Sequence, residues 1–482
     1  MSHEKSSDEK SSHTPLWEGF AYKPHQEYGV SWLLKREEGP IRGGLLCDEM
    51  GLGKTIQMLG LIKESSAQST LLIAPLAVIN QWKDTAERCK IRCFTYNSKS
   101  NAWELKTKPF SNSKSLYLIG YECLANNIKH VEQKVFDRVV CDEAHRLGVK
   151  NIAAKLTKGV IEKLAFNTVR RMTKNATSKW FLTATPVVNS VDDIYSLFAL
   201  LDKSLVTEEI ETLMGTYALA RSMEQLRTSI PDAPNAPLIK NHRLDFASRD
   251  EEEFYTKIQS NVEAQLRYNE KAFIVLRLIL MLRQLSIHPQ IYIEARKKKV
   301  RGVYEDWLEP STKFLKIKEL MTEESHENHK WIIFCHFHEE MELLEKYLKT
   351  LDFVRNIETY SGSLDMTEKA DALKKVREPF VEGAGTCDIL LCQLKAGGVG
   401  LNLQEFDRIV FNGPWWTQAA IDQGIGRAVR IGQKNQVVVH NLVLKQEESV
   451  NVRNIDVWMR AKAEEKEAEN RMALDMADSN LV

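Results

Sequence analysis

The first part of the chain alternates short apolar runs with amphipathic stretches. Five such runs lie in this part: GGLLC at 43–47, TLLIAP at 70–75, LYLIG at 116–120, RVVCDE at 138–143 and KWFLTAT at 179–185. Runs that are apolar throughout and separated by helical segments are typical of parallel strands buried between two layers of helices. The pattern therefore predicts an α/β lobe over residues 16–203.

The pattern changes after residue 203 and later returns. Residues 204–310 are more polar and helical, with prolines at 231, 234 and 237 that mark a turn or hinge. A second alternation has its apolar runs at 331–335, 387–393, 408–412 and 437–444. The expected organisation has five parts: a disordered tail at 1–15, lobe 1 at 16–203, a helical insertion and linker at 204–310, lobe 2 at 311–449 and a charged C-terminal helix at 450–482.

Composition narrows the function classes. Hydrophobic residues make up 43% of the 482 and charged residues 27%, which fits a globular protein and excludes a disordered or fibrous one. Lys plus Arg and Asp plus Glu both number 66, so binding to nucleic acid requires basic residues gathered on one surface. The longest apolar stretch, 273–282, is too short to span a membrane, and no signal peptide is expected. None of the eight cysteines forms a Cys-x-x-Cys pair, so we expect no zinc module.

The segment DEMGLGKT at 48–55 lies between a predicted strand and an amphipathic helix at 56–63. That context is typical of a phosphate-binding loop. Gly51 and Gly53 let backbone N–H groups converge on phosphate oxygens, and the N-terminus of the helix adds positive potential there. Asp48 stands where the strict phosphate-loop pattern has its first glycine. The alternative for this motif taken alone is a glycine-rich turn that caps a helix.

Two motifs supply side chains for nucleotide chemistry. Lys54 would reach the β- and γ-phosphates, and the Thr55 hydroxyl would bind Mg²⁺. The strand at 138–143 ends in Asp142, suited to holding the metal, and Glu143, suited to orienting and deprotonating a water. Because this pair follows a strand and lies about 90 residues after the loop, a solvated acidic loop is the weaker interpretation.

A third motif is DQGIGRAVRIGQ at 422–433. Arg427 and Arg430 are three residues apart, which predicts that both lie on one helical face. Two guanidinium groups there would clamp the transferred phosphate from the second lobe, a contact worth about 10³–10⁵ in rate. A solvated helix face would be the better interpretation of the arginine pair alone, but the two other motifs favour the catalytic one.

In this order the motifs resemble the motor of the SWI/SNF-like branch of helicase superfamily two, over most of residues 20–446. The first-lobe segments that carry the resemblance are YKPHQEYGVSWL (22–33), DEMGLGKT (48–55), LLIAPLAVINQW (71–82), DEAHRL (142–147) and FLTATPVVNSVDDIYSLFALL (181–201). The later segments are LRQLSIHPQIY (282–292), WIIFCHF (331–337), YSGS (360–363), KAGGVGLNL (395–403), PWWTQA (414–419) and GRAVRIGQ (426–433). The pairing of GGVGLNL with RIGQ is specific to this branch.

The resemblance implies two RecA-like lobes with parallel sheets that hydrolyse ATP with Mg²⁺ and move along double-stranded DNA. By residue matching, the nucleotide site of lobe 1 consists of Gln26, Asp48, Gly51, Leu52, Gly53, Lys54, Thr55, Asp142 and Glu143, with Gln26 reading the adenine. Gln423, Arg427 and Arg430 complete the site from lobe 2. Thr183 and Thr185 couple the nucleotide to lobe movement, and Lys395 is a candidate contact to DNA phosphate.

The resemblance also implies a monomeric motor in the nucleus that acts on nucleosomes or other DNA-bound proteins. The phrases VDDIYSLFALL and LKAGGVGLNL are most similar to the DNA-repair branch, whose members often carry a RING module; the cysteine spacing gives no such module here, so ubiquitin ligation is not carried over. Residues 152–180 are longer than the family's usual spacing. This insertion holds basic residues that are a candidate contact to DNA or a partner: Arg170, Arg171, Lys174 and Lys179.

Other interpretations stay open at this point. A strand-separating DEAH-type helicase fits the D-E-A-H residues but not GGVGLNL and RIGQ. A non-catalytic scaffold is disfavoured by the intact motif residues. The run ARKKKVR at 295–301 is either a DNA contact or a solvated face, and Trp415–Trp416 either stack on a ligand or belong to the core.

Overall fold

The computed structural model describes residues 13–108, 110, 114–158, 163–230, 233–268, 272–299, 304–381, 383, 385–394, 401–430, 432–445 and 454–477. The chain divides into two compact units. Unit 1 contains the residues up to Ala233 together with those from Lys466 onward, and unit 2 contains Pro234–Glu465. Lys395, with the rest of KAGGVG, and most of the expected disordered tail lie outside the described residues.

Unit 1 is built on an eight-stranded sheet. In sheet order its strands are β4 (Ala102–Leu105), β3 (Arg92–Asn97), β5 (Ser115–Gly120), β2 (Ser69–Ala74), β6 (Arg138–Asp142), β7 (Ser178–Leu182), β1 (Gly43–Leu46) and β8 (Ala218–Leu219). Neighbouring strands are parallel except β3 and β4, which form an antiparallel hairpin at one edge. The five apolar runs of the first lobe are β1, β2, β5, β6 and β7, which confirms these predicted strands.

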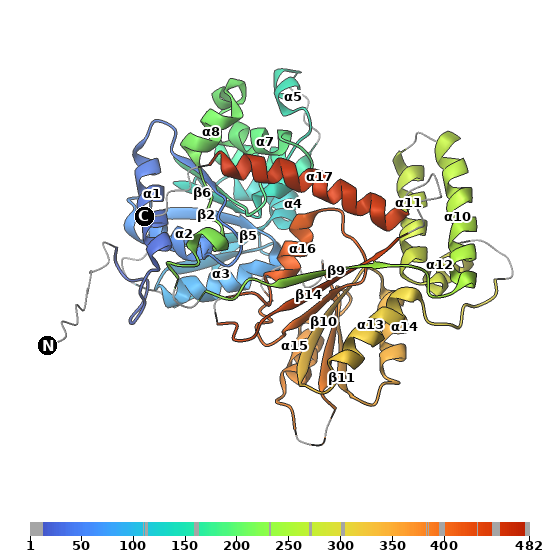
Figure 1. Ribbon diagram of the computed structural model, residues 1–482. Helices are drawn as coiled ribbons and strands as arrows, with labels where there is room; N and C mark the ends of the chain where they lie inside the picture. The colour runs from blue at the N-terminus through green and yellow to red at the C-terminus, as the bar shows by residue number, and fades with distance from the viewer. Residues whose placement is uncertain are drawn as a thin grey trace. The chain divides into compact units, whose positions relative to one another are not determined.

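Helices cover both faces of this sheet (Figure 1). They are α1 (Pro24–Glu38), α2 (Lys54–Glu64), α3 (Leu76–Arg88), α4 (Tyr121–Val131), α5 (Ile152–Lys158), α6 (Leu164–Thr173), α7 (Asp192–Leu201), α8 (Ile210–Tyr217) and α9 (Met223–Leu226), with 3₁₀ turns at Ala144–Leu147 and Lys203–Thr207. Leu71 and Ile73 of β2 pack with Phe166 and Phe198 of the helices, while Leu72 between them is buried on the opposite face. Burial on both faces explains why this strand is apolar throughout.

Unit 2 has a six-stranded sheet in which all neighbours are parallel. In sheet order its strands are β11 (Val354–Tyr360), β12 (Cys387–Gln393), β10 (His329–Cys335), β13 (Arg408–Phe411), β14 (Val438–Leu444) and β9 (Leu238–Leu244). Its helices are α10 (Arg249–Tyr268), α11 (Ala272–Ile287), α12 (Pro289–Lys297), α13 (Thr312–Glu323), α14 (His338–Leu348), α15 (Met366–Arg377), α16 (Gln418–Ile425) and the first part of α17 (Ile455–Asp475).

The unit 2 sheet also has a core on each face. Ile333 of β10 packs with Phe314 of α13 and Leu344 of α14, and these two helices lie side by side in Figure 1. Ile332, the next residue of β10, packs with Val376 of α15 on the other face. The predicted α/β alternation of both lobes is therefore confirmed, and the fold is that of two RecA-like lobes.

The segment 204–310, expected to be a helical insertion and linker, also contains two strands. Strand β8 pairs with β1, with Leu219 opposite Leu46, and β9 pairs with β14 along its whole length. Each of these strands lies at the edge of its sheet and pairs with a strand that is distant in sequence. A local pattern of residues therefore does not reveal them. Helix α11 is amphipathic: Leu278 is fully buried, whereas Leu276 is 60% exposed.

Two local contacts stabilise helices of unit 2 and of the C-terminal segment. His288 caps α12, because its Nδ1 accepts a hydrogen bond from the backbone N–H of Gln290 at 3.1 Å. The charged C-terminal helix is α17, and Arg471 pairs with Glu467 at 3.1 Å.

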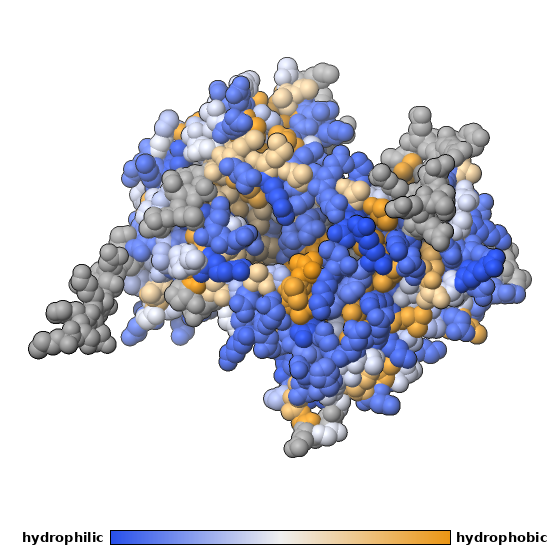
Figure 2. Space-filling model, viewed as in Figure 1, coloured by the Kyte–Doolittle hydropathy of each residue, from blue (hydrophilic) through white to orange (hydrophobic). Residues whose placement is uncertain are grey.

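The surface mixes residue types. On the face drawn in Figure 2, hydrophilic side chains predominate and apolar ones are interspersed among them. Within the described part of the chain, no helix combines the length and the apolar character that a membrane span requires.

Candidate nucleotide-binding site

Three of the predicted motifs lie at the carboxyl ends of neighbouring strands of unit 1. The loop at 48–55 follows β1, Asp142 ends β6, and Thr183 follows β7, which lies between those two strands. Leu182 of β7 pairs in register with both Leu46 and Asp142. Because ligands of open α/β sheets bind outside the carboxyl ends of the strands, this edge is the candidate site.

The loop at 48–55 folds around its lysine. Lys54 Nζ donates a hydrogen bond to the backbone carbonyl of Asp48 at 2.6 Å and a longer one to that of Glu49 at 3.4 Å. Gly53 has φ of +84°, a left-handed conformation that favours glycine, and α2 begins directly after it. The lysine ammonium and the N-terminus of α2 therefore lie together, which is the arrangement that binds phosphate.

The first turn of α1 is attached to the same loop. His25 Nε2 donates to the backbone carbonyl of Leu52 at 2.9 Å, and Gln26 Nε2 reaches the same oxygen at 3.4 Å. The Gln26 side-chain oxygen accepts from the backbone N–H of Lys23 at 3.2 Å. Burial lowers the pKa of His25. The structure thus places Gln26 beside the phosphate loop.

The acidic pair after β6 is held by an indole. Trp82 Nε1 of α3 donates to Asp142 Oδ2 at 2.8 Å, and the backbone N–H of Glu143 donates to Asp142 Oδ1 at 3.0 Å. Burial, with the charge of Glu143 close by, raises the pKa of Asp142 to about 6, while the hydrogen bond from Trp82 opposes this rise. Two neighbouring, half-buried carboxylates favour the binding of a cation beside them.

His145 connects the acidic pair to the segment after β7. Its Nδ1 lies 3.4 Å from Glu143 Oε2 and 3.2 Å from the Thr183 hydroxyl, which in turn accepts from the backbone N–H of Thr185 at 3.1 Å. Burial lowers the pKa of His145 to about 4, so the imidazole is neutral at pH 7. The His145 side chain thus lies between those of Glu143 and Thr183 and contacts both.

The available donors fit a hard divalent cation. Thr55 in the first turn of α2 supplies a hydroxyl, and Asp142 supplies a carboxylate, the oxygen ligands that Mg²⁺ takes beside substrate phosphates. Across the residues that the structure describes, no three or more His, Cys, Asp or Glu side chains are grouped to hold a metal. Mg²⁺ sites use one or two carboxylates and complete their coordination with phosphate and water.

The predicted residues of the second lobe lie after the carboxyl end of β13. Gln423 is in α16, but this helix ends at Ile425, so the expectation that Arg427 and Arg430 share a helical face is wrong. The arginines follow the helix in a turn, in which Arg430 Nε donates to the backbone carbonyl of Gly426 at 2.6 Å. Arg427 is buried, with 1% of its surface exposed.

The two tryptophans considered as stacking residues, Trp415 and Trp416, differ in solvent exposure. Trp415 is 8% exposed and stacks on His336 with ring centroids 4.2 Å apart, which favours the core interpretation. Trp416 is 36% exposed.

Several basic residues outside the motifs have hydrogen-bond or ion-pair partners within the protein. Lys298 of the ARKKKVR run pairs with Glu339 at 2.7 Å. In the insertion, Arg171 pairs with Glu132 at 2.5 Å, and Lys179 Nζ donates to the backbone carbonyl of Leu201 at 2.6 Å.

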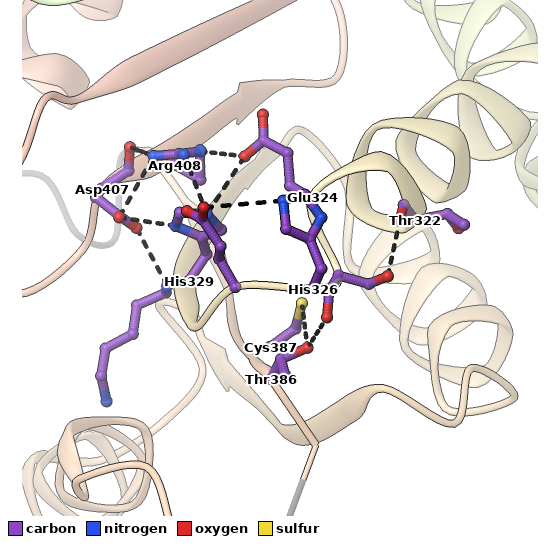
Figure 3. Close-up of polar contacts among 11 residues, drawn as sticks. Thr322, Glu324, His326, His329, Thr386, Cys387, Asp407 and Arg408 are labelled. Atoms are coloured by element: carbon purple, nitrogen blue, oxygen red, sulfur yellow. Dashed lines mark hydrogen bonds and ion pairs between the residues drawn. The ribbon is translucent and has the colours of Figure 1, made fainter.

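A second polar cluster lies at the opposite edge of the unit 2 sheet, where β10, β12 and β13 begin (Figure 3). His329 Nδ1 donates to Asp407 Oδ2 at 2.9 Å, and Arg408 Nη2 donates to His329 Nε2 at 3.1 Å. The Arg408 guanidinium also pairs with Glu324. These contacts join the turn before β10 to β13, so we assign the cluster a structural role.

Three residues that support the unit 1 site have no role that the sequence pattern reveals: Trp82, Gln57 and Arg221. Trp82 lies within a recognised motif, but nothing in the pattern shows that its indole meets Asp142. Arg221 lies 173 positions after Asp48, yet its guanidinium binds the Asp48 carboxylate, which is fully buried. The buried side chain of Asp48 thus anchors the phosphate loop to Arg221.

A phosphate loop after β1, an acidic pair after β6 and a second RecA-like unit together define a P-loop nucleotide hydrolase of the helicase type. Comparison with known families agrees: the SNF2-related domain profile matches residues 25–212, and the profile of the helicase conserved C-terminal domain matches residues 312–432. The chain belongs to the SWI/SNF-like family of ATP-hydrolysing, helicase-related enzymes.

Relatives occur in bacteria, a virus and eukaryotes. The putative ATP-dependent helicase/translocase YwqA of Bacillus subtilis is 23% identical over 89% of this chain and 47% of its own. The probable global transactivator of Orgyia pseudotsugata multicapsid polyhedrosis virus is 26% identical over 92% of this chain and 89% of its own. The ISWI chromatin-remodeling complex ATPase ISW1 of Saccharomyces cerevisiae is 24% identical over 89% of this chain and 39% of its own. The chain thus spans less than half the length of the bacterial and yeast proteins.

Proposed function

We propose that the chain is a motor that hydrolyses ATP and uses the cycle to translocate along double-stranded DNA. The observation that carries this proposal is the alignment of the phosphate loop, Asp142 and Thr183 at the carboxyl ends of adjacent strands. Membership of a family that includes a putative translocase and a chromatin-remodelling ATPase supports the choice of DNA as the track.

The residues of unit 1 divide the work on the nucleotide. Lys54 binds the β- and γ-phosphates, moving from the loop carbonyls that hold it here. Thr55 and Asp142 would hold Mg²⁺, which would neutralise phosphate charge during transfer. Glu143 orients the attacking water and takes its proton. Gln26 reads the adenine from α1.

Unit 2 completes the reaction. Gln423, Arg427 and Arg430 contact the phosphates when the two units close on the nucleotide, and these contacts are lost after hydrolysis. The link from Glu143 through His145 to Thr183 and Thr185 passes the state of the γ-phosphate to the segment after β7. Alternating closure becomes stepping when the units grip DNA in turn.

The contacts with DNA are made mainly to phosphates, because a motor that steps must tolerate every sequence. Lys395 remains a candidate contact. The natural obstacles for such a motor are nucleosomes or other proteins bound to DNA, in chromatin or in repair. The expected nuclear location and monomeric state stay predictions, as does the similarity to the DNA-repair branch.

The experiment is a steady-state ATPase assay with no nucleic acid, duplex DNA, single-stranded DNA and RNA at two salt concentrations. We expect the largest stimulation with duplex DNA and a loss of stimulation at the higher salt. Lys54→Ala and Glu143→Gln should abolish turnover; hydrolysis that survives Glu143→Gln contradicts the assigned role of this residue.

A displacement assay separates translocation from strand separation. The motor should strip a triplex-forming strand from its duplex and leave an ordinary duplex paired. Separation of the ordinary duplex would favour a DEAH-type helicase instead.

A further inference from the structure

Arg221 is the centre of a fully buried polar network in unit 1. Its Nε and Nη2 donate to the two carboxylate oxygens of Asp48 at 3.0 and 2.6 Å, a bidentate ion pair with both side chains fully buried. Its Nη2 also donates to Gln57 Oε1 at 2.9 Å, and its Nη1 donates to the backbone carbonyl of His25 at 2.6 Å. Gln57 Nε2 in turn donates to Asp48 Oδ2 at 2.9 Å.

These partners come from the three elements that surround the candidate nucleotide site. Asp48 begins the phosphate loop, Gln57 belongs to α2, and His25 precedes the adenine-reading Gln26 in α1. The network needs close packing against α1: a Cβ on Gly29 would lie 1.8 Å from Gln57 Oε1. One guanidinium therefore fixes the relative positions of α1, the loop and α2.

Asp48 is bound at both ends. Its carboxylate is held by Arg221, while its backbone carbonyl accepts the hydrogen bond from Lys54 Nζ at 2.6 Å. A shift of Asp48 therefore moves the oxygen that holds the phosphate-binding ammonium. Because catalysis and binding lose heavily when a charged group is displaced by about 1 Å, the position of Asp48 matters to the nucleotide.

The backbone on either side of Arg221 is attached to the same loop. Leu219 accepts from the backbone N–H of Cys47 at 2.7 Å, and Arg221 accepts from that of Glu49 at 2.8 Å. The carboxylate of Glu49 accepts from the backbone N–H of Met223 at 2.6 Å. The chain then continues to Ala233, the last residue of unit 1 before unit 2 begins. The segment 218–223 thus connects the loop to the linker between the units.

We propose that Arg221 is a positioning residue that holds the phosphate loop and α1 in the ATP-binding geometry and ties them to the segment leading to unit 2. This inference rests on the proposed role of Lys54 in phosphate binding. A bidentate Arg–carboxylate pair is suited to this because its planar fork fixes direction as well as distance, which a lysine does not.

The test compares Arg221→Lys with Arg138→Lys. Arg138 is an equally buried arginine of unit 1 that forms a bidentate pair with Glu37 at 2.6 and 2.5 Å and contacts neither the loop nor Lys54 in the described structure. We expect Arg221→Lys to raise the KM for ATP at least tenfold with a smaller change in kcat. Arg138→Lys should lower the melting temperature to a similar degree but change the KM less than twofold.

A second readout is trypsin cleavage in the segment that leads to unit 2. Arg227 is exposed and provides a trypsin site just after the segment. A non-hydrolysable ATP analogue should slow cleavage after Arg227 in the wild type and have no such effect in Arg221→Lys. Asp48→Asn, which keeps the shape of the side chain and removes its charge, should reproduce both effects and replaces Arg221→Lys if that variant does not fold.

The outcomes are distinguishable. An inactive wild type, or full activity in Lys54→Ala, would contradict the proposed function itself. An active wild type in which the Arg221→Lys, Asp48→Asn and Arg138→Lys variants show the same KM and the same protection of Arg227 would overturn the positioning role alone.

Discussion

The indole N–H of Trp82 donates a hydrogen bond to the carboxylate of Asp142 at 2.8 Å, although the two residues lie 60 positions apart. The bond joins the first turns of α3 to the end of β6 and fixes the orientation of the acidic group that is expected to face the metal. Groups that support a metal ligand from behind commonly tune its affinity as strongly as 10–100-fold.

Trp82→Phe keeps most of the ring volume and removes the N–H donor. The pKa of Asp142, about 6, should rise further, because the hydrogen bond favours the charged form. We expect about a tenfold increase in the Mg²⁺ concentration that gives half-maximal ATPase activity at pH 7. Trp180→Phe is the matched control, since Trp180 donates to Glu37 at 2.9 Å. An equal Mg²⁺ requirement in the two variants would contradict the prediction.

Gly53→Ala places a methyl group where Gln26 lies. The new Cβ would be 2.6 Å from Gln26 Nε2, in addition to the strain of about 1–2 kcal/mol at a left-handed φ. We expect a higher KM for ATP and a weaker preference for ATP over GTP, both measured by steady-state hydrolysis. Gly19→Ala introduces similar strain at φ of +76° with nothing within 4 Å. If Gly53→Ala hydrolyses ATP and GTP with the same relative preference as the wild type, Gln26 does not recognise the adenine.

Arg427→Ala and Arg430→Ala should each lower kcat by about 10³–10⁵, because a guanidinium that stabilises the transferred phosphate acts mainly in the transition state. The Kd for ATP, measured by equilibrium binding, should change much less. Arg408→Ala, in the structural cluster of the same unit, should leave kcat within a few-fold. Near-normal turnover in both Arg427→Ala and Arg430→Ala would show that these arginines of unit 2 do not take part in hydrolysis.

Lys313 and Asp456 form a buried ion pair in unit 2, with an N–O distance of 2.6 Å. Removing one partner leaves an unpaired charge in the interior, so Lys313→Met or Asp456→Asn should lower the free energy of unfolding by about 3–5 kcal/mol. The double variant should lose less than the sum of the two. Denaturant titration of the single, double and Glu464→Ala variants tests this, because the Arg460–Glu464 pair is exposed and contributes about 0.5 kcal/mol or less.

Acid should destabilise unit 2 through His440. Burial lowers the pKa of His440 to about 3, and the nearby His242, Lys240, Arg408 and Lys316 add to this effect. In the unfolded chain the imidazole titrates near 6.5, so the unfolded state gains a proton first as the pH falls.

His440 therefore has no destabilising effect above pH 6.5. Below this pH it lowers the free energy of unfolding by up to about 1.4 kcal/mol per pH unit. His440→Asn should flatten the decline in unfolding free energy between pH 6.5 and 5. His130→Asn, at an exposed position, should not. Parallel pH profiles for the wild type and His440→Asn would show that this buried imidazole does not contribute to acid sensitivity.

The sequence alone determined the two α/β alternations, the strands that carry the motifs and the order of the motifs along the chain. These features are local: a strand buried on both faces must be apolar throughout, and a phosphate loop needs its glycines, lysine and hydroxyl within eight residues. The family follows from the same segments.

Only the tertiary structure determined the features that require residues distant in sequence to come into contact. It placed β8 and β9 at sheet edges, ended α16 before Arg427, brought Trp82 to Asp142 and set Arg221 against Asp48. Strand pairing and buried ion pairs are chosen by the geometry of elements far apart in the chain, where a single arginine or a two-residue strand leaves no periodic pattern. The motif residues could therefore be named from the sequence, but the side chains that hold them in position could not.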